Sequence, residues 1–217
     1  MKRKFDDAFS EYEYHKRRVT RYGYNLLDVP ESLKTKELVK IAVSDCGSTL
    51  DYVPKNLKTQ EIVIIAVSNN GCALQYVPEN LKTKELVKIA VSQNGYSLEY
   101  VPEHIKTEEI VRIAVSNNDC ALKYVPENLM TKEIARLAVS IRLYAFNYVP
   151  KKLIDNNLIL IYISRSINRF VYFNEKYKHN INKLNYEKAK EYLKLRIGNE
   201  QNYLNDTKFK DLIINYI

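Results

Sequence analysis

The apolar and polar residues of this 217-residue chain recur with a step of 24 residues. A fixed period of 20 to 50 residues is typical of solenoids and other repeat arrays. About five copies are clear between Tyr22 and Pro150, and a sixth, degenerate copy extends to about Asn174. The residue types that keep the step most regularly are proline (Pro30, Pro54, Pro78, Pro102, Pro126, Pro150), glycine (Gly23, Gly47, Gly71, Gly95), alanine (Ala42, Ala66, Ala90, Ala114, Ala138) and tyrosine (Tyr52, Tyr76, Tyr100, Tyr124, Tyr148).

The pattern inside each copy predicts an amphipathic α-helix. Polar residues follow one another at a step of four, and the positions between them are apolar, which is helical periodicity. Thr83 and Glu85 are typical of a helix start, as the N-cap and as a first-turn acid. The polar set is Lys84, Lys88 and Ser92, and the apolar set is Leu86, Val87, Ile89, Ala90 and Val91.

The end of each copy predicts a second, shorter helix. We expect Asn94-Gly95 to end the first helix, with the glycine in the left-handed conformation. A short helix then runs from about Tyr96 to Val101, because Pro102 lacks the N–H that would continue it. The fold class expected is all-α: an α-solenoid of about five to six 24-residue helical-hairpin repeats with a helical C-terminal cap.

A leucine-rich repeat is the alternative fold, since Ile62-x-x-Ile65-x-Val67-x-x-Asn70-x-Cys72 loosely matches its strand register. In such a strand the residues between core positions face solvent. Here those residues are Val87 and Ala90 and their equivalents in the other copies, so the helical interpretation is favoured.

The charge divides the chain into three parts. The expected segments are a basic arm at 1–21, the repeat array at 22–174 and a basic helical cap at 175–217. The arm has 7 basic and 4 acidic residues, and residues 151–217 have 13 basic and 7 acidic residues. Residues 22–150 are nearly neutral, so any nucleic-acid binding is expected only through the termini, because phosphate affinity needs clustered Lys and Arg.

Each basic end has two interpretations. Lys2-Arg3-Lys4 and His15-Lys16-Arg17-Arg18 are either a nuclear-import signal or phosphate-binding arm, or a solvated terminal segment. A helix expected from Asn185 to Ile197 either covers the open end of the solenoid, which such arrays need for solubility, or is a basic interaction helix.

The sequence contains no motif for catalysis, a metal or a cofactor. Cys46, Cys72 and Cys120 form no C-x-x-C pair, and their odd number predicts buried free thiols in a reducing compartment, the cytoplasm or the nucleus. No phosphate loop, H-E-x-x-H or nucleophile elbow is present. We expect no enzyme activity, no cofactor and no membrane association.

Two rows of residues are candidates for an interaction surface. One is a basic row on successive first helices, interrupted by Ile64. Each of its members has a glutamate three residues earlier, a spacing that predicts ordinary surface ion pairs within the helix. The other row varies in residue type from copy to copy, which in repeat proteins marks a recognition surface. The first row is Lys40, Lys88, Arg112 and Arg136, and the second is Asp51, Gln75, Glu99, Lys123 and Asn147.

The run Asn70-Gly71-Cys72-Ala73-Leu74-Gln75-Tyr76, followed by Glu79, Leu81, Lys82, Glu85 and Val87, resembles the repeats called domain of unknown function 4116. The likeness covers about 130 residues, although proline stands where the family usually has Ala or Ser. Such repeats occur in bacteria, protists and large DNA viruses of amoebae, and the resemblance implies helical structure and no catalytic residues. The leading hypothesis is a non-enzymatic protein-interaction scaffold. The alternative is a nucleic-acid-associated protein that uses its basic termini.

Overall fold

The computed structural model describes residues 2–163, which form α-helices joined by short 3-10 helices. No strand occurs within this range. The all-α prediction is therefore confirmed, and the leucine-rich alternative is wrong. The chain divides into two compact units, residues 1–130 and 131–217. The expected cap at 175–217 and the end of the sixth copy at 164–174 lie outside the described residues.

Each repeat consists of a ten-residue α-helix, a six-residue 3-10 helix and a three-residue 3-10 helix. In unit 1 these elements follow α1 (Lys2–Arg21), η1 (Gly23–Asp28) and η2 (Glu31–Leu33). They are α2 (Lys36–Asp45), η3 (Gly47–Tyr52), η4 (Lys55–Leu57), α3 (Gln60–Asn69), η5 (Gly71–Tyr76), η6 (Glu79–Leu81), α4 (Lys84–Gln93), η7 (Gly95–Tyr100), η8 (Glu103–Ile105), α5 (Glu108–Asn117), η9 (Asp119–Tyr124) and η10 (Glu127–Leu129).

In unit 2 the described elements are α6 (Lys132–Ile141), η11 (Leu143–Tyr148), η12 (Lys151–Leu153) and α7 (Asn156–Ile163). The second helix of each hairpin is thus a 3-10 helix. It begins one residue earlier than the pattern predicted, at the residue that is glycine in most copies.

The predicted helix starts are confirmed. In α4 the hydroxyl oxygen of Thr83 accepts a hydrogen bond from the backbone N–H of Leu86, over 3.2 Å. The threonines before α2, α3, α5 and α6 do the same. In unit 2 Asp155 takes this role for α7, where its Oδ1 accepts from the N–H of Leu158 over 3.0 Å.

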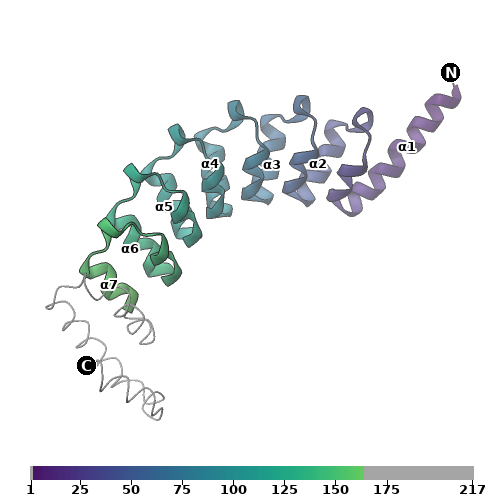
Figure 1. The fold of residues 1–217 in the computed structure, drawn as a ribbon. Helices are drawn as coiled ribbons and strands as arrows, with labels where there is room; N and C mark the ends of the chain where they lie inside the picture. The colour runs from purple at the N-terminus through teal and green to yellow at the C-terminus, as the bar shows by residue number, and fades with distance from the viewer. Residues whose placement is uncertain (1, 164–217) are drawn as a thin grey trace, which may run out of the picture. The chain divides into compact units, whose positions relative to one another are not determined.

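The core lies between the α-helices and the 3-10 helices of successive repeats. In α4 the buried residues are Leu86, Val87, Ala90 and Val91, and η7 adds Leu98. The helices α2 to α5 of unit 1 lie side by side (Figure 1), so each repeat covers the apolar face of its neighbour. Because one repeat cannot bury that face alone, the array is stable only as a stack.

The glycines serve packing between repeats and not the left-handed conformation that we expected. No glycine in the described residues has a positive φ. A Cβ at Gly71 would overlap the carbonyl oxygen of Ala90 in the following repeat, and it would lie 2.9 Å from Ser97 Oγ. Gly47 and Gly95 meet the carbonyl oxygens of the equivalent alanines in the same way. Glycine is needed here because two backbones approach closely.

The basic arm is a helix, and its second half packs against the first repeat. His15 and Val19 are buried. Lys16 Nζ lies 2.8 Å from Glu37 Oε1 on α2. This part of the chain is therefore helical and docked, in contrast to the solvated terminus that was one of its interpretations.

We predict that Gly71→Ala lowers the free energy of unfolding by about 1–3 kcal/mol, because the added methyl group must push two repeats apart. Urea unfolding followed by far-UV circular dichroism measures the change. Gln75→Ala, at an exposed position of the same 3-10 helix, is the matched control and should unfold like the wild type. Equal midpoints for Gly71→Ala and the wild type would contradict the close-packing role of this glycine.

Candidate interaction surface

The two rows predicted from the sequence lie on different elements of the repeat. Lys40, Lys88 and Arg112 lie on α2, α4 and α5 of unit 1, and Arg136 lies on α6 of unit 2. We call these four residues the basic row. The variable residues lie on the six-residue 3-10 helices instead. The two rows differ most in how their charges are paired.

The two lysines of the basic row pair with the next repeat. Lys40 Nζ lies 2.8 Å from Glu61 Oε1 on α3, and Lys88 Nζ lies 2.7 Å from Glu109 Oε1 on α5. The expected partners three residues earlier, Glu37 among them, are not used. The reason is that neighbouring α-helices pack 8–10 Å apart, a distance that a lysine side chain spans.

The two arginines also avoid the expected partner. Arg112 Nε lies 3.0 Å from Glu108 Oε1, four residues earlier in the same helix. In unit 2, Arg136 Nη2 lies 2.7 Å from Asp155 Oδ2, and Lys132 Nζ lies 3.5 Å from the same oxygen. The expectation of pairs at a spacing of three is therefore wrong at all four positions. Every side chain of the basic row is therefore paired with an acid of the protein.

These ion pairs lower the pKa of the glutamates that form them. Hydrogen bonds from Lys36 and Lys40, with their positive charges, lower the pKa of Glu61 to about 2. The hydrogen bond from Lys88 likewise lowers the pKa of Glu109. We call the pairing of a first-helix lysine with the glutamate of the next repeat the lysine clamp.

The lysine clamp is missing between α3 and α4. Gln60 and Ile64 stand on α3 where α2 has Lys36 and Lys40. Glu85, the acid that would accept, is exposed and takes part in no ion pair among the described residues. Ile64 is the residue that interrupts the basic row in the sequence. Because it carries no charge, α3 and α4 are not joined by an ion pair among the described residues.

Further polar side chains join one repeat to the next, and sequence analysis missed both kinds. Asn69 Oδ1 accepts from the N–H of Gly47 over 2.7 Å, and its Nδ2 donates to the carbonyl oxygen of Ser44 over 2.9 Å. Asn117 makes the equivalent bonds in α5. The sequence signal for these bonds was the recurrence of asparagine after 48 residues, at Asn69 and Asn117.

A row of lysines in the turns bonds to backbone oxygens of the following repeat. Lys82 Nζ donates to the carbonyl oxygen of Tyr100 over 3.1 Å, and the side chain of Lys82 is nearly buried. The series is Lys34 to Tyr52, Lys58 to Tyr76, Lys82 to Tyr100 and Lys106 to Tyr124. These lysines satisfy carbonyl groups at the ends of 3-10 helices, which would otherwise lack partners.

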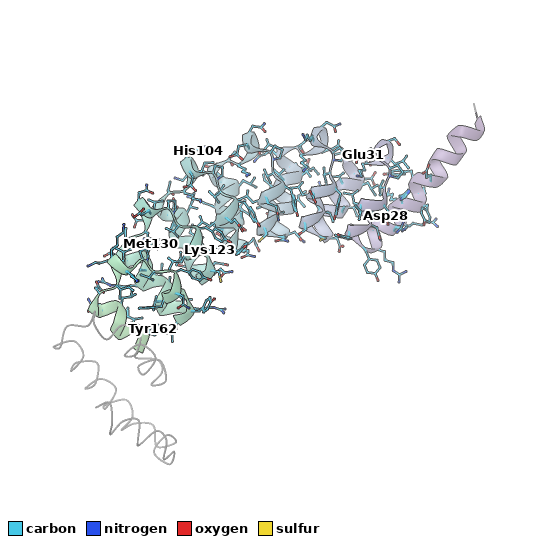
Figure 2. The ribbon with its side chains drawn as sticks, viewed as in Figure 1. Asp28, Glu31, His104, Lys123, Met130 and Tyr162 are labelled. Carbon is cyan, nitrogen blue, oxygen red and sulfur yellow. The ribbon has the colours of Figure 1, made fainter. Side chains whose placement is uncertain are left out.

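The variable row remains open to solvent. Asp51, Gln75, Glu99 and Lys123 in unit 1 are exposed, and so is Asn147 in unit 2. In the part of the chain that the structure describes, the three charged members form no ion pair. We call the four residues of unit 1 the η surface. In Figure 2, Asp28 and Lys123 lie on the lower side of unit 1, and Glu31 and His104, from the short turns, lie on the upper edge.

Tyrosines border the η surface. Tyr96 meets Tyr124 of the next repeat edge to face, with ring centroids 5.1 Å apart, and Lys123 Nζ lies over the Tyr124 ring, 5.3 Å from its centroid. Burial of the hydroxyl, together with hydrogen bonds to Tyr96 and Glu99, raises the pKa of Tyr124 well above its ordinary value. Lys123 and Glu99 thus both contact the aromatic residue Tyr124.

The other candidate features give weaker signals. The three cysteines are free and half-buried, whereas the sequence predicted full burial. Within the described range no three His, Cys, Asp or Glu residues are grouped as metal ligands would be, and no helix is both long and apolar enough to cross a membrane. A shallow hollow of about 350 Å³ lies along α1, and it is lined by Glu13, Lys16, Arg17, Thr20 and Arg21.

Comparison with known proteins identifies the repeats. The family model of a domain of unknown function, DUF4116, matches residues 13–58, 59–106 and 107–154, which is three consecutive matches over more than half of the chain. Each match spans two of the 24-residue copies. No curated protein and no solved structure matched.

The lysine clamp predicts that the free energy of unfolding decreases at low pH. Since the pKa of Glu61 falls from its ordinary 4.5 to about 2 in the folded chain, the clamp stabilises the fold above pH 4.5 and this contribution is lost as the pH falls toward 2. The difference in urea midpoint between the wild type and Glu61→Gln should therefore be larger at pH 6 than at pH 3. A difference that stays constant with pH would exclude this role for Glu61.

The missing clamp predicts a stabilising substitution. Gln60→Lys with Ile64→Lys should pair with Glu85 and raise the free energy of unfolding by about 0.5 kcal/mol, the size of an exposed ion pair. Thermal unfolding at low and high salt measures it, since screening should remove the gain. The control is the same pair of lysines with Glu85→Gln, and an equal gain there would show that no clamp had formed.

Proposed function

This chain belongs to the DUF4116 repeat family, and we propose that it is a non-enzymatic scaffold that binds another protein through the η surface. One observation carries the proposal. Side chains at the equivalent exposed position differ in charge from repeat to repeat, while the residue before each of them is a buried leucine that does not vary in unit 1. The exposed members are Asp51, Gln75, Glu99 and Lys123, and the buried ones are Leu50, Leu74, Leu98 and Leu122.

A constant core beneath varying exposed positions is how repeat proteins build a recognition surface. The structural roles in this repeat belong to other positions: the N-cap threonines, the glycines, and the asparagines and lysines that join neighbours. The side chains of the η surface are free of those roles. Their variation therefore costs the fold little, and they are available for a partner.

The basic row is a poorer candidate for the same function. Its charges already have partners in the protein, as in the pairs Lys40–Glu61 and Lys88–Glu109. A ligand would have to displace those acids before it gained the same interaction, and rim charges are worth little in binding.

The second candidate is nucleic-acid association through the basic termini. Among the described residues it is favoured by α1, where Arg17 is exposed and forms no ion pair. Lys16 and Arg18 pair with Glu37 and Asp28, and Arg21 lies over the ring of Tyr22. Among residues 11–21 of this helix, Arg17 is the one cation without an ion pair or a tyrosine ring beside it, and phosphate affinity rises with the number of free cations.

A reducing compartment, the cytoplasm or the nucleus, is part of the proposal, because all three cysteines are free thiols and disulfides persist in oxidising compartments.

The scaffold proposal predicts that reversing two charges on the η surface removes partners. Full-length protein carrying Glu99→Lys with Lys123→Glu keeps its net charge but inverts the local pattern. In affinity capture from cells of the native source, quantified by mass spectrometry, we expect proteins bound by the wild type to fall at least about fivefold with this variant, the upper range for exposed ion pairs.

The matched control is Glu85→Lys with Lys55→Glu, which reverses two exposed and unpaired charges away from the η surface. It should retain the partners. Retention of every partner by the η-surface variant would remove this surface from consideration. Loss of binding after nuclease treatment, together with a steep salt dependence, would favour the nucleic-acid candidate instead.

A further inference from the structure

Exposed apolar side chains begin the η surface at its N-terminal end. Tyr24 and Leu27 are 54% and 50% exposed, and they stand where the next repeat has Ser48 and Asp51. Because residues three apart eclipse each other on a 3-10 helix, Tyr24 and Leu27 form one patch. Tyr22, directly before η1, is 59% exposed. We call Tyr22, Tyr24 and Leu27 the apolar anchor.

The fold makes only partial use of the apolar anchor. The Tyr24 hydroxyl lies 2.9 Å from that of Tyr52, and the two rings meet edge to face. Leu27 has no comparable role, although it precedes Asp28, whose carboxylate pairs with Arg18 at 2.6 Å. Exposed tyrosines beside a leucine, with a charge nearby, resemble the aromatic-rich core and the polar rim of a protein interface.

Beyond the anchor, the η surface has a fixed order of polarity. Repeat by repeat it runs from apolar Leu27 to acidic Asp51, neutral Gln75, acidic Glu99 and basic Lys123. None of the three charged side chains forms an ion pair within the described residues; Glu99 hydrogen-bonds to Tyr124, and Lys123 lies over the ring of the same tyrosine. A complementary ligand must therefore carry an apolar group, two positive charges and one negative charge in that order.

The spacing of the repeats indicates an extended ligand. Neighbouring helices pack about 8–10 Å apart, and an extended chain advances about 3.3 Å per residue. A peptide lying across the repeats thus meets a new 3-10 helix about every third residue. One discriminating position per repeat, in a single row, matches this linear register.

We infer that the η surface and the apolar anchor together bind an extended peptide of about 13 residues. Its apolar residue contacts the anchor, basic residues about three and nine positions further along the peptide face Asp51 and Glu99, and an acidic residue about twelve positions along faces Lys123. This inference rests on the proposed scaffold function and specifies its partner.

The test uses full-length protein and synthetic peptides in fluorescence anisotropy at low salt. The ordered peptide has Leu first, Lys at about the fourth and tenth positions and Glu at about the thirteenth, with Ser and Gly elsewhere. It is made in both chain directions. The control has the same composition with Glu moved to the fourth position and Lys to the thirteenth. We expect one ordered peptide to bind about five- to tenfold more tightly than its control, the effect of two favourable pairs replaced by two repulsive ones.

A charge swap tests the register itself. Glu99→Lys should weaken the ordered peptide about fivefold, and a peptide with Glu in place of the tenth-position Lys should recover that loss. Leu27→Asp should weaken every peptide. The Glu85→Lys variant is the matched control and should bind as the wild type does.

Equal binding of ordered and control peptides would overturn the inference, as would the absence of binding by either peptide at millimolar concentration. So would an oligonucleotide that binds where the peptides do not. The scaffold proposal would survive these results if Glu99→Lys with Lys123→Glu still removed the captured partners, because a folded protein would then be the occupant. Partners that stay bound to that variant would refute the scaffold proposal separately.

Discussion

Close approach of one repeat's backbone to the next is the constraint on which the rest of unit 1 depends. Where a six-residue 3-10 helix begins with glycine, its start lies against a carbonyl oxygen of the following α-helix, so near that a Cβ at Gly71 would overlap the oxygen of Ala90. At this distance, buried apolar faces can interlock and the amide of Asn69 can bridge the N–H of Gly47 and a backbone oxygen. A separation larger by one methyl group would disturb both, and for this reason glycine and alanine hold these positions so regularly.

The same closeness assigns the polar residues to two groups. Side chains between neighbouring repeats become partners of one another: Lys40 reaches Glu61, and Lys82 reaches the carbonyl oxygen of Tyr100. Charged side chains on the outer positions of the 3-10 helices form no ion pair within the described residues, and Glu99 hydrogen-bonds instead to the hydroxyl of Tyr124. An ionic row on a repeat protein can therefore be part of its framework, and the pairing of its charges distinguishes such a row from a surface that is open to a ligand.

Much of the fold could be predicted from the sequence, because its signals are local. The 24-residue step, the polar positions four apart and the threonine before each helix report on hydrogen bonds within one repeat, and Thr83 caps α4 as expected. What could not be predicted depends on distances between repeats. The partner of Lys88 was expected in its own helix and lies in the next one. Gly95 was assigned to a left-handed turn, and its real role depends on an atom of the following repeat. For the candidate site, the exposure of Glu99 followed from periodicity, but its freedom from ion pairs did not.

The contact between α3 and α4, which has no lysine clamp, lies in the repeats that also carry part of the η surface. Each other neighbouring pair of α-helices from α1 to α5 has a lysine on the first helix and an acid on the second, and only this pair has Ile64 opposite Glu85. It lies midway along the η surface, beneath the repeats that carry Gln75 and Glu99. Exposed ion pairs add little stability each, so the loss of one does not unfold the stack. It does leave α3 and α4 without an ion pair among the described residues, although Lys82 still donates a hydrogen bond to the carbonyl oxygen of Tyr100 across the same repeat contact. An elongated ligand that spans all four positions would then cross the one neighbouring pair of α-helices from α1 to α5 that has no lysine clamp, so the register that it meets there depends on apolar packing and on the hydrogen bond of Lys82.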